Sequence, residues 1–535
     1  MYVEAKTLGL LGPEILLVAM ATLLYVGGAF YRQRETWSII ALVSYVLAGG
    51  WLLYSSTGAE VIVTSGPISA TGMSVCLRVL ALVLGIAYTL VAAQSTDKLL
   101  ATEYLGSLML IVVGLMLVAG ANELVLLFLG FELISIPTYV LLFIGRRDRS
   151  TAEATMKYFY LSILSSALLL FGMALLFGMS GTTTIQGSTT VPGIREAILK
   201  SSAAEASGPL KALLALAPFA LVLLLAGLGF KLTAAPFHFY APDVYQGTTN
   251  ANAGLLAVAP KIAGAIGIIR LIVVALPIAA DYAWQAALVL AVITMTLGNV
   301  CALWQKNIRR MMAYSAIAHG GYLLLGLAAA TGATAFPALS AEGGVAAIVT
   351  YVVVYSLASL GTFTALAYLG SARREVQSVN ELAGLGKAQP AAAAVIAVCM
   401  FSLAGLPPLA GFWGKLGLFM SALQLATAEG NVGLGFVILL VVGALNAAIG
   451  AAYYLRIVAL MFFQPATEDV PAAGGMGALS ASLLCGALVV LAGIAPGSIM
   501  HLASQGEMQL QQVTSHQSLQ SLPAPTAVVQ QLPAE

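Results

Sequence analysis

Long apolar stretches, each about the length needed to cross a bilayer, recur fourteen times along the 535-residue chain. A transmembrane helix needs roughly 20 consecutive apolar residues. The composition agrees, since 60% of the residues are hydrophobic and 8% are charged, whereas soluble domains average about 25% charged residues. Lipid does not tolerate unpaired backbone groups, and no alternating barrel pattern is present. We therefore predict an all-α polytopic membrane protein with about 14 transmembrane helices.

Positive charge is unevenly divided between the loops. If the segments alternate across the membrane, one side carries twelve basic residues and the other carries four: Lys6, Arg195, Lys200 and Lys211. Cytoplasmic loops are typically enriched in Lys and Arg. This bias predicts that both termini lie outside, in the periplasm if the cell is bacterial, with the chain in the inner (plasma) membrane. The twelve residues are Arg32, Arg34, Lys98, Arg146, Arg147, Arg149, Lys306, Arg309, Arg310, Arg373, Arg374 and Lys387.

Five ionisable residues lie inside apolar stretches: Glu132, Lys157, Lys231, Lys261 and Lys415. Each costs ~2.5 kcal/mol or more if it faces lipid, and such residues mark ion or proton pathways. Buried ion pairs are the structural alternative for the glutamate. Snorkelling to the interface is the alternative for Lys157, which lies only a turn or two into its segment. The set favours a polar path through the membrane.

Two of these lysines lie near predicted helix breaks. Pro236 follows Lys231, and Pro407 and Pro408 precede Lys415. Proline removes a backbone donor and interrupts a helix, which frees carbonyls and leaves a polar gap at membrane depth. Paired interrupted helices are typical of transporters built from internal repeats. His238, beside the first break, and His319 are candidate proton relays, with a hydrogen-bonded structural role as the alternative.

A row of this kind can move protons. A lysine in a dry site gives up its proton more readily, and a nearby carboxylate opposes that release. We hypothesise that Glu132 and Lys231 form a switch, that Lys261 relays the proton and that Lys415 delivers it.

The sequence contains no pattern typical of a redox or nucleotide site. Four cysteines lie far apart in apolar stretches, with none of the spacings of a metal or iron–sulfur site. No phosphate-binding glycine-rich loop follows a strand. We expect no cofactor, no metal and no nucleic acid to bind this chain. Residues 504–535 are rich in Gln, Ser and Pro and are predicted to form a disordered tail.

Four motifs resemble the antiporter-like membrane subunits of respiratory complex I. They are FLGFEL at 128–133, PFHFYAPDVYQG at 236–247, NIRRMMAYSAIAHGGY at 307–322 and SLAGLPPLAGFWGK at 402–415. The resemblance covers about residues 100 to 465. Within the family, Lys415 and the short tail after the last segment favour the subunit N branch of NADH–quinone oxidoreductase. One departure is the stretch 248–253, TTNANA, where the family commonly has an Ala-Pro-x-Pro-like sequence.

The resemblance implies a domain organisation and a function. Three peripheral helices occupy 1–100, two inverted five-helix repeats occupy 101–280 and 281–465, and a last transmembrane helix occupies 466–503. The first repeat has a long loop at about 181–211, and the seventh and twelfth helices are discontinuous. The family's glutamate–lysine pair falls on Glu132 and Lys231, its central and terminal lysines fall on Lys261 and Lys415, and Lys157 also has a counterpart.

The implied role is that of a proton-translocating subunit of an NADH:quinone oxidoreductase that has no redox centre of its own. NADH, FMN, iron–sulfur clusters and quinone are then expected in partner subunits, and the partners are other membrane subunits, including neighbouring antiporter-like ones. Two alternatives remain: a stand-alone or Mrp-type cation/proton antiporter, and a scaffold whose buried charges are structural ion pairs.

Overall fold

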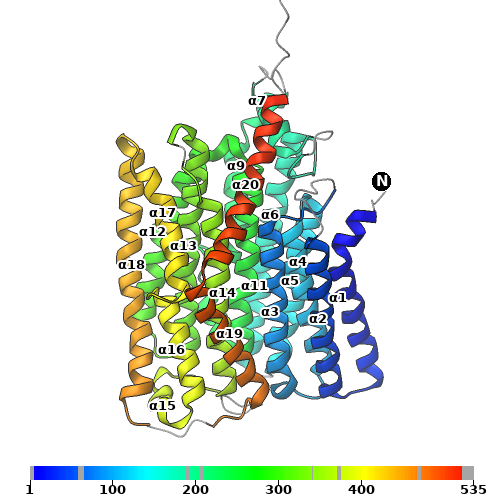
Figure 1. Ribbon diagram of the computed structural model, residues 1–535, viewed down its shortest axis with the longest axis vertical. Coiled ribbons are helices and arrows are strands. Elements are labelled where there is room, and N and C mark those ends of the chain that lie inside the picture. Colours follow the sequence, from blue (N-terminus) through cyan, green and yellow to red (C-terminus); the bar gives the residue numbers. More distant parts are fainter. Residues whose placement is uncertain are drawn as a thin grey trace, which may run out of the picture.

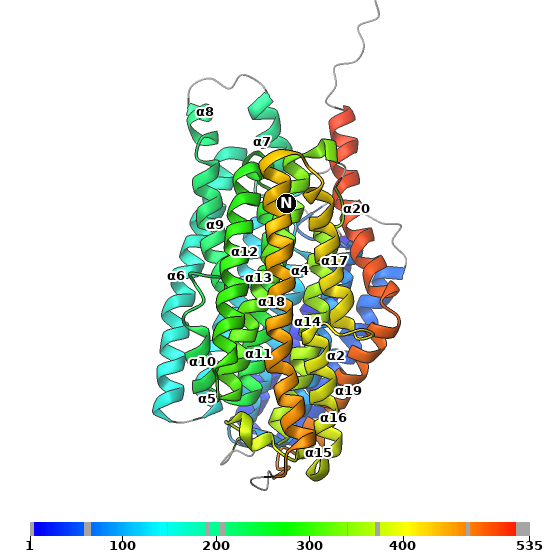
Figure 2. The same ribbon diagram turned by 90° about the vertical axis from the view of Figure 1, so that its left-hand side faces the viewer.

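The computed structural model describes residues 5–57, 66–146, 148–187, 192–203, 209–339, 341–369, 375–466 and 471–520. Within these ranges the chain is a bundle of α-helices, and β-structure is limited to isolated bridges. The predicted all-α fold class is therefore confirmed. Most long helices run roughly parallel to one axis, with α7 and α8 at one end and α15 at the other (Figures 1 and 2).

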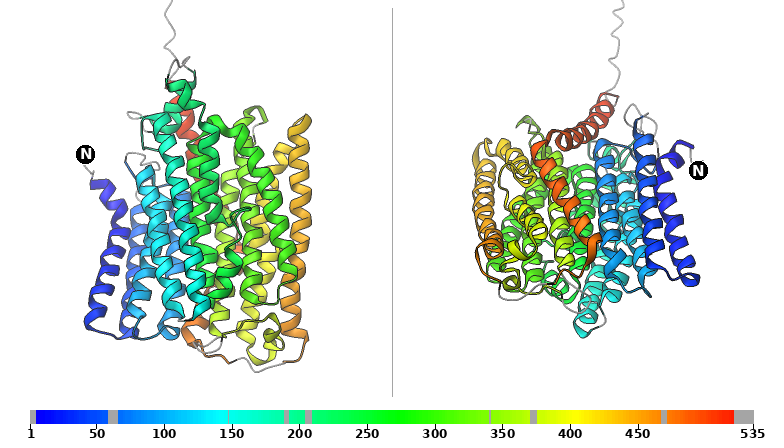
Figure 3. Two further views of the ribbon diagram at one scale, coloured as in Figure 1. Left: turned by 180° about the vertical axis from the view of Figure 1, so that it is seen from behind. Right: turned by 60° about the horizontal axis from the view of Figure 1, so that its bottom comes forward.

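The first three helices form one flank of the bundle. They are α1 (Ala5–Phe30), α2 (Arg34–Thr57) and α3 (Gly72–Ser95). A buried ion pair holds α3 against α1, since Arg78 Nη2 lies 2.6 Å from Glu14 Oε2. Seen from behind, these blue helices and the orange α18 (Gly430–Phe463) lie at opposite sides of the molecule (Figure 3).

The next group surrounds the first predicted break. It consists of α4 (Ala101–Gly120), α5 (Leu124–Gly145), α6 (Arg149–Ser180), α9 (Ala217–Leu232), α10 (Ala241–Gly247) and α11 (Asn250–Gly267), which continues as the π-helix η1 (Ile268–Val274). The predicted loop between α6 and α9 contains two short helices, α7 (Ile194–Ala203) and α8 (Pro209–Leu214).

A second group surrounds the second break. It consists of η2 (Pro277–Ala279), α12 (Ala280–Leu303), α13 (Ile308–Ala335), η3 (Pro337–Leu339), α14 (Gly344–Tyr368), η4 (Val379–Leu382), α15 (Leu385–Ala388), α16 (Pro390–Ala404), α17 (Ala410–Ala426) and α18. The two groups meet where α11 packs against α14 and α10 packs against α13.

Both predicted breaks are present. The helix α9 ends at Leu232, and Thr233 follows in the left-handed region with φ +57°. The helix α16 ends at Ala404, and Gly405 follows with φ +88°. A left-handed residue closes a helix by turning its N–H back to the last carbonyls. Glycine adopts this conformation without the steric cost that a β-carbon brings.

Twelve helices among the described residues are long and apolar enough to cross a membrane. The seventh and twelfth expected segments correspond to the shorter apolar helices α9 and α16, each followed by a second short helix beyond its break. The count of fourteen, the repeat boundaries and the inverted symmetry stay predictions.

The C-terminal end differs from the prediction. After α19 (Gly475–Ile494), the helix α20 covers Gly497–Gln520 and packs along α3 and α14 on the outside of the bundle (Figures 1 and 2). The sequence analysis predicted a disordered tail from residue 504; α20 includes residues 504–520 of that stretch, and residues 521–535 lie outside the described ranges. The polar side chains have a structural use: Glu507 accepts hydrogen bonds from the backbone at the start of α14, and Gln509 accepts one from Gly72 at the start of α3.

Candidate functional site

Four of the predicted basic residues lie deep in the bundle. The exposed fractions of Lys231, Lys261, His319 and Lys415 are 4%, 0%, 4% and 7%. They come from α9, α11, α13 and α17, so both groups of helices contribute. Neighbouring members share a helix end, an aromatic ring or a cavity, as described below, so we describe them as one row.

The row begins between α5 and α9. Lys231 Nζ donates to Ser135 Oγ at 3.2 Å and lies 5.1 Å from the ring centre of Phe131. Glu132 Oε1 accepts a hydrogen bond from Ser166 Oγ at 2.5 Å. The carboxylate and the ammonium attract each other electrostatically, yet no direct ion pair between them occurs among the described residues. Serine side chains from α5 and α6 therefore hold the two charges of the predicted switch.

Lys261 is attached to the first break. Its Nζ donates to Thr233 Oγ1 at 3.1 Å, and Thr233 is the left-handed residue that closes α9. The same Nζ lies 5.7 Å from the ring centre of Tyr355 on α14. Lys231 lies two residues before Thr233 in the last turn of α9, so both lysines lie at this helix end.

His319 is surrounded by tyrosines. Its Nδ1 lies 2.5 Å from the hydroxyl of Tyr351, and its Nε2 lies 3.0 Å from the hydroxyl of Tyr454. The ring of Tyr355, which also contacts Lys261, lies 4.7 Å from the imidazole. The histidine therefore lies next in the row after Lys261.

Lys415 closes the second break. Its Nζ donates to the carbonyl oxygens of Leu403 and Ala404, both at 2.9 Å, and lies 5.2 Å from the ring centre of Tyr322. A small cavity of about 10 Å³ separates it from His319, and Ser402 and Tyr351 also line this space. A single water needs about 10–15 Å³, so the gap has room for one bridging water.

Lys157 and His238 lie apart from this row. Lys157 Nζ lies 3.1 Å from Asp243 Oδ2 and 2.7 Å from Glu153 Oε1, and 41% of its side chain is exposed. Asp243 also pairs with Arg310 at 2.7 Å, which links α6, α10 and α13. His238 is half-buried just after the first break. No hydrogen bond among the described residues joins His238 to the four lysines.

The sequence did not identify the groups that connect the row. These are Ser135, Thr233, Ser166 and the tyrosines 322, 351, 355 and 454. A hydroxyl in an apolar stretch is common and is usually satisfied locally, as when Ser135 donates to the carbonyl of Phe131. Only the spatial arrangement distinguishes the connecting hydroxyls from the others.

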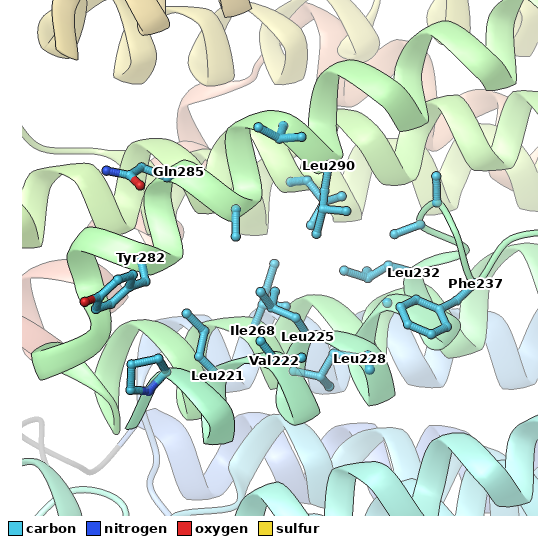
Figure 4. Close-up of a pocket in the computed structure, with 18 residues that line it drawn as sticks. Leu221, Val222, Leu225, Leu228, Leu232, Phe237, Ile268, Tyr282, Gln285 and Leu290 are labelled. Atoms are coloured by element: carbon cyan, nitrogen blue, oxygen red, sulfur yellow. The ribbon is translucent and has the colours of Figure 1, made fainter. Parts of the chain in front are cut away.

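An apolar cavity lies apart from the row. It has a volume of about 570 Å³ and lies between α9 and α12, where aliphatic side chains such as Leu225, Leu228 and Leu290 point into it (Figure 4). Val222 and Val289 on its rim are 60% and 54% exposed, so it opens on the outer surface of the bundle. None of the predicted site residues lines it. Its chemistry suits hydrocarbon, not a charged substrate.

Comparisons with known proteins agree with this arrangement. Residues 121–443 match the family described as "NADH:quinone oxidoreductase/Mrp antiporter, TM". The NADH-quinone oxidoreductase subunit N of Rhodospirillum rubrum is 37% identical over 388 residues, which are 72% of this chain and 73% of the relative. The subunit N of Trichlorobacter lovleyi is 33% identical over 509 residues, which are 94% of this chain and 97% of the relative.

Two solved structures of respiratory and Mrp complexes contain chains that are similar to this one. A chain of respiratory complex I from Thermus thermophilus with bound aureothin has a TM-score of 0.72 and 30% identity, with 92% of this chain and 100% of that chain covered. A chain of the Mrp complex from Dietzia sp. DQ12-45-1b has a TM-score of 0.75 at 19% identity, with 96% of this chain and 99% of that chain covered. The two chains therefore share the fold. This chain therefore belongs to the NADH-quinone oxidoreductase subunit N family, among the antiporter-like membrane subunits of respiratory complex I.

Proposed function

We propose that this chain is a proton-translocating membrane subunit of an NADH:quinone oxidoreductase. The observation that carries this function is the continuous row of four buried basic groups, Lys231, Lys261, His319 and Lys415, which spans both helix groups. Ionisable groups inside a membrane protein are costly, and proton relays are one of their established uses.

The first step is a switch at Glu132 and Lys231. The carboxylate attracts the ammonium, whose Nζ also donates to Ser135 Oγ, and so favours the charged lysine. A displacement of Glu132 away from α9 weakens this attraction, and Lys231 then releases its proton. Among the described hydrogen bonds Glu132 is held only by Ser166 on α6, and a shift of α5 against α9 changes the separation of Glu132 from Lys231.

The later steps follow the contacts. Lys261 bonds Thr233, which follows Lys231 by two residues at the end of α9, so a proton crosses there through the threonine hydroxyl or through water admitted by the break. Lys261 and His319 share the face of Tyr355. The small cavity then connects His319 with Lys415, which delivers the proton beyond the second break. Lys157, paired with Asp243 at the end of α6, would supply protons to the row, with His238 as a further relay.

The oxidation of NADH takes place elsewhere in this proposal. NADH, FMN, iron–sulfur clusters and quinone bind partner subunits, and this chain contributes no redox centre to the enzyme. Its neighbours are other membrane subunits, including antiporter-like ones. The relatives from Rhodospirillum rubrum and Trichlorobacter lovleyi are NADH-quinone oxidoreductase subunits N, which supports this assignment.

We further propose that the end of the bundle that carries α15 faces the cytoplasm. The basic residues Arg34, Arg146, Lys306 and Lys387 lie at the helix ends on this side, whereas α1 begins and α20 ends at the opposite end (Figure 1). The positive-inside rule supports this orientation. Both termini are then periplasmic, and the membrane is the bacterial inner membrane.

A stand-alone cation/proton antiporter is the second candidate, because the fold is also that of an Mrp subunit. The identity to subunit N, 33% over nearly the full length, favours the first candidate. Co-purification with flavin and iron–sulfur subunits separates the two. An antiporter would instead transport cations in vesicles that contain no NADH.

Charge-removing variants test the row itself. We expect Lys231→Ala or Glu132→Ala to abolish NADH-driven proton pumping in membrane vesicles while the complex still assembles. Exposed Lys98→Ala serves as the matched control. Normal pumping in assembled Lys231→Ala complexes would show that the buried charges are structural.

A further inference from the structure

The apolar cavity between α9 and α12 has one polar end. Figure 4 shows Tyr282 and Gln285 at this end, Leu232 and Phe237 at the other, and aliphatic side chains between them. The polar end lies near α7, because η2, which directly precedes α12, packs against both α7 and α9. The cavity therefore runs from the end of the bundle proposed above to be periplasmic down to the first helix break.

One face of α9 forms a wall of this cavity, with lining residues at every third or fourth position. They are Pro218, Leu221, Leu225, Leu228 and Leu232. The first and last of them lie fourteen residues apart, which is about 21 Å along a helix. Half the hydrocarbon thickness of a bilayer is about 15 Å. The cavity is therefore long enough to cross one leaflet.

The cavity is also narrow. A volume of about 570 Å³ over a length of about 21 Å gives a mean cross-section of about 27 Å². Even the full empty space of about 1290 Å³, which includes space outside the mouth, gives about 61 Å². A helix with side chains is about 10–12 Å wide, hence roughly 80–110 Å² in cross-section. A partner helix therefore does not fit inside, whereas a single hydrocarbon chain does, since carbons in contact lie about 3.5–4.0 Å apart.

The polarity of the cavity matches that of a lipid. None of the 18 residues that line it is charged. Val222 and Val289 on its rims are exposed on the outer surface of the bundle, where a membrane protein meets acyl chains. Tyr282 is 58% exposed at the polar end, and tyrosines are enriched at the level of the headgroups.

From this geometry we propose that the cavity holds one acyl chain of a membrane phospholipid, with the headgroup near Tyr282 and Gln285 and the end of the chain at the first break. Leu232, Ala235 and Phe237 line the inner end. The backbone N–H of Ala235 donates to Thr294 Oγ1 on α12 at 3.0 Å, so the break itself closes this end. The tail of a quinone and side chains of a partner subunit are the other occupants that the test has to exclude.

The bound chain supports α9 from outside. On the inner side of the cavity, Leu228 and Leu232 pack directly on α11. A β-carbon at Gly264 would lie 2.9 Å from Leu232 Cδ2, and one at Gly267 would lie still closer to Leu228. A chain that fills the cavity therefore holds the last turn of α9 against α11, because closely packed side chains transmit a displacement.

This support reaches the proton row. Lys231 lies in the same last turn of α9, and Thr233, directly after that turn, bonds Lys261 on α11. The position of the turn thus sets how the two lysines approach each other at the break. The lipid site itself stands on the shape and chemistry of the cavity, and only its effect on transport rests on the proposed function.

Photolabelling of the assembled complex tests the site. The complex is reconstituted in vesicles of phosphatidylethanolamine and phosphatidylglycerol that contain a phosphatidylethanolamine with a diazirine at the end of one acyl chain. We expect residues 232–237 to be labelled several times more than the exposed face of α6, because a lodged chain end stays at the break. Equal labelling of the two overturns the inference, since freely exchanging lipid labels all exposed helices alike.

Variants that fill the cavity give the matched comparison. Ala226 and Ala286 line opposite walls, so Ala226→Phe/Ala286→Phe should abolish the excess label and each single variant should lower it. Ala174→Phe, at an exposed position on α6, is the control and should leave the label unchanged. Excess label that persists in the double variant overturns the inference. Labelling of residues 232–237 by a quinone with a diazirine in its tail, or a crosslink from Ala226→Cys to a partner subunit, also overturns it.

Hydrogen exchange tests the support of α9. Removal of phospholipid with cholate, a detergent without an alkyl chain, should speed exchange of the amides at 228–232 roughly tenfold in the wild type. The double variant should resist this change, because its phenylalanine rings take the place of the chain. Unchanged exchange in the wild type shows that the chain does not support the helix. Labelling and exchange need no NADH, so a failure of the proposed proton transport, seen as normal pumping in Lys231→Ala, stays distinct from a failure of this inference.

Discussion

The Nζ of Lys415 lies 2.9 Å from the carbonyl oxygen of Leu403, so the lysine that follows the second break closes the helix that precedes it. The last carbonyls of a helix have no partner within that helix. A charged donor satisfies them at membrane depth, where water is scarce. One side chain therefore has both a structural and a proposed transport role at this site.

Replacing Lys415 should affect both roles. In Lys415→Ala, two buried carbonyls lose their donor, which costs about 1–3 kcal/mol per unsatisfied group. We expect pumping to be lost and hydrogen exchange to accelerate at the end of α16. Lys415→Arg keeps a cation and donors, so it should keep the protection of α16. Equal exchange in Lys415→Ala and the wild type would show that the carbonyls find another partner.

Ser135 should set the strength of the Glu132–Lys231 switch. Its hydroxyl accepts from Lys231 Nζ at 3.2 Å and donates to the carbonyl of Phe131 at 2.9 Å. Ser135→Ala removes an oxygen that stabilises the ammonium, so we expect slower pumping with normal assembly. The loss should be smaller than in Lys231→Ala. Ser421→Ala, a buried serine on α17 whose hydroxyl bonds its own helix, is a suitable comparison, and a similar effect there would contradict a specific role.

The sequence was sufficient to predict the fold class, the two breaks and the family. Ionisable residues stand out in apolar stretches because lipid penalises them, so Lys231, Lys261 and Lys415 were identifiable without a structure. Proline at 236 and 407 marked the breaks because its missing N–H interrupts a helix anywhere.

The partners of these residues were not predictable. Lys415 binds carbonyls rather than an acid, and the tyrosines around His319 come from positions 351 and 454, on two other helices. Such contacts depend on tertiary packing, which has no local pattern. The contacts of α20 were not predictable for a similar reason, since Glu507 and Gln509 resemble disorder-promoting residues until their helix-end partners are known.

The buried ion pair of Arg78 and Glu14 should affect stability without affecting transport. Both side chains are at most 3% exposed, and neither contacts the row. Arg78→Leu leaves the carboxylate buried without its partner, which costs about 3–5 kcal/mol. We expect less assembled complex, with normal pumping per assembled complex. The double variant Arg78→Leu/Glu14→Leu should restore assembly, because no charge is then left unpaired; failure of this rescue would contradict the explanation.

Glu507 should make the attachment of α20 depend on pH. Burial raises the pKa of this carboxyl above its ordinary value of 4.5, although hydrogen bonds from the backbone of Ala346, Val345 and Gly343 oppose the shift. Because the pKa is higher in the folded state, the stabilising contribution is complete below pH 4.5 and declines as pH rises through the raised value. We expect amides at the start of α14 to lose protection over that range, after correction for intrinsic exchange.

Glu507→Gln separates this effect from other titrations. Gln resembles the protonated acid, so its protection should match the wild type at acid pH and exceed it above the raised pKa. Glu507→Ala removes the acceptors and should expose the start of α14 at every pH. If protection in the wild type rises with pH relative to Glu507→Gln, the backbone hydrogen bonds outweigh burial and the sign of the proposed pKa shift is wrong.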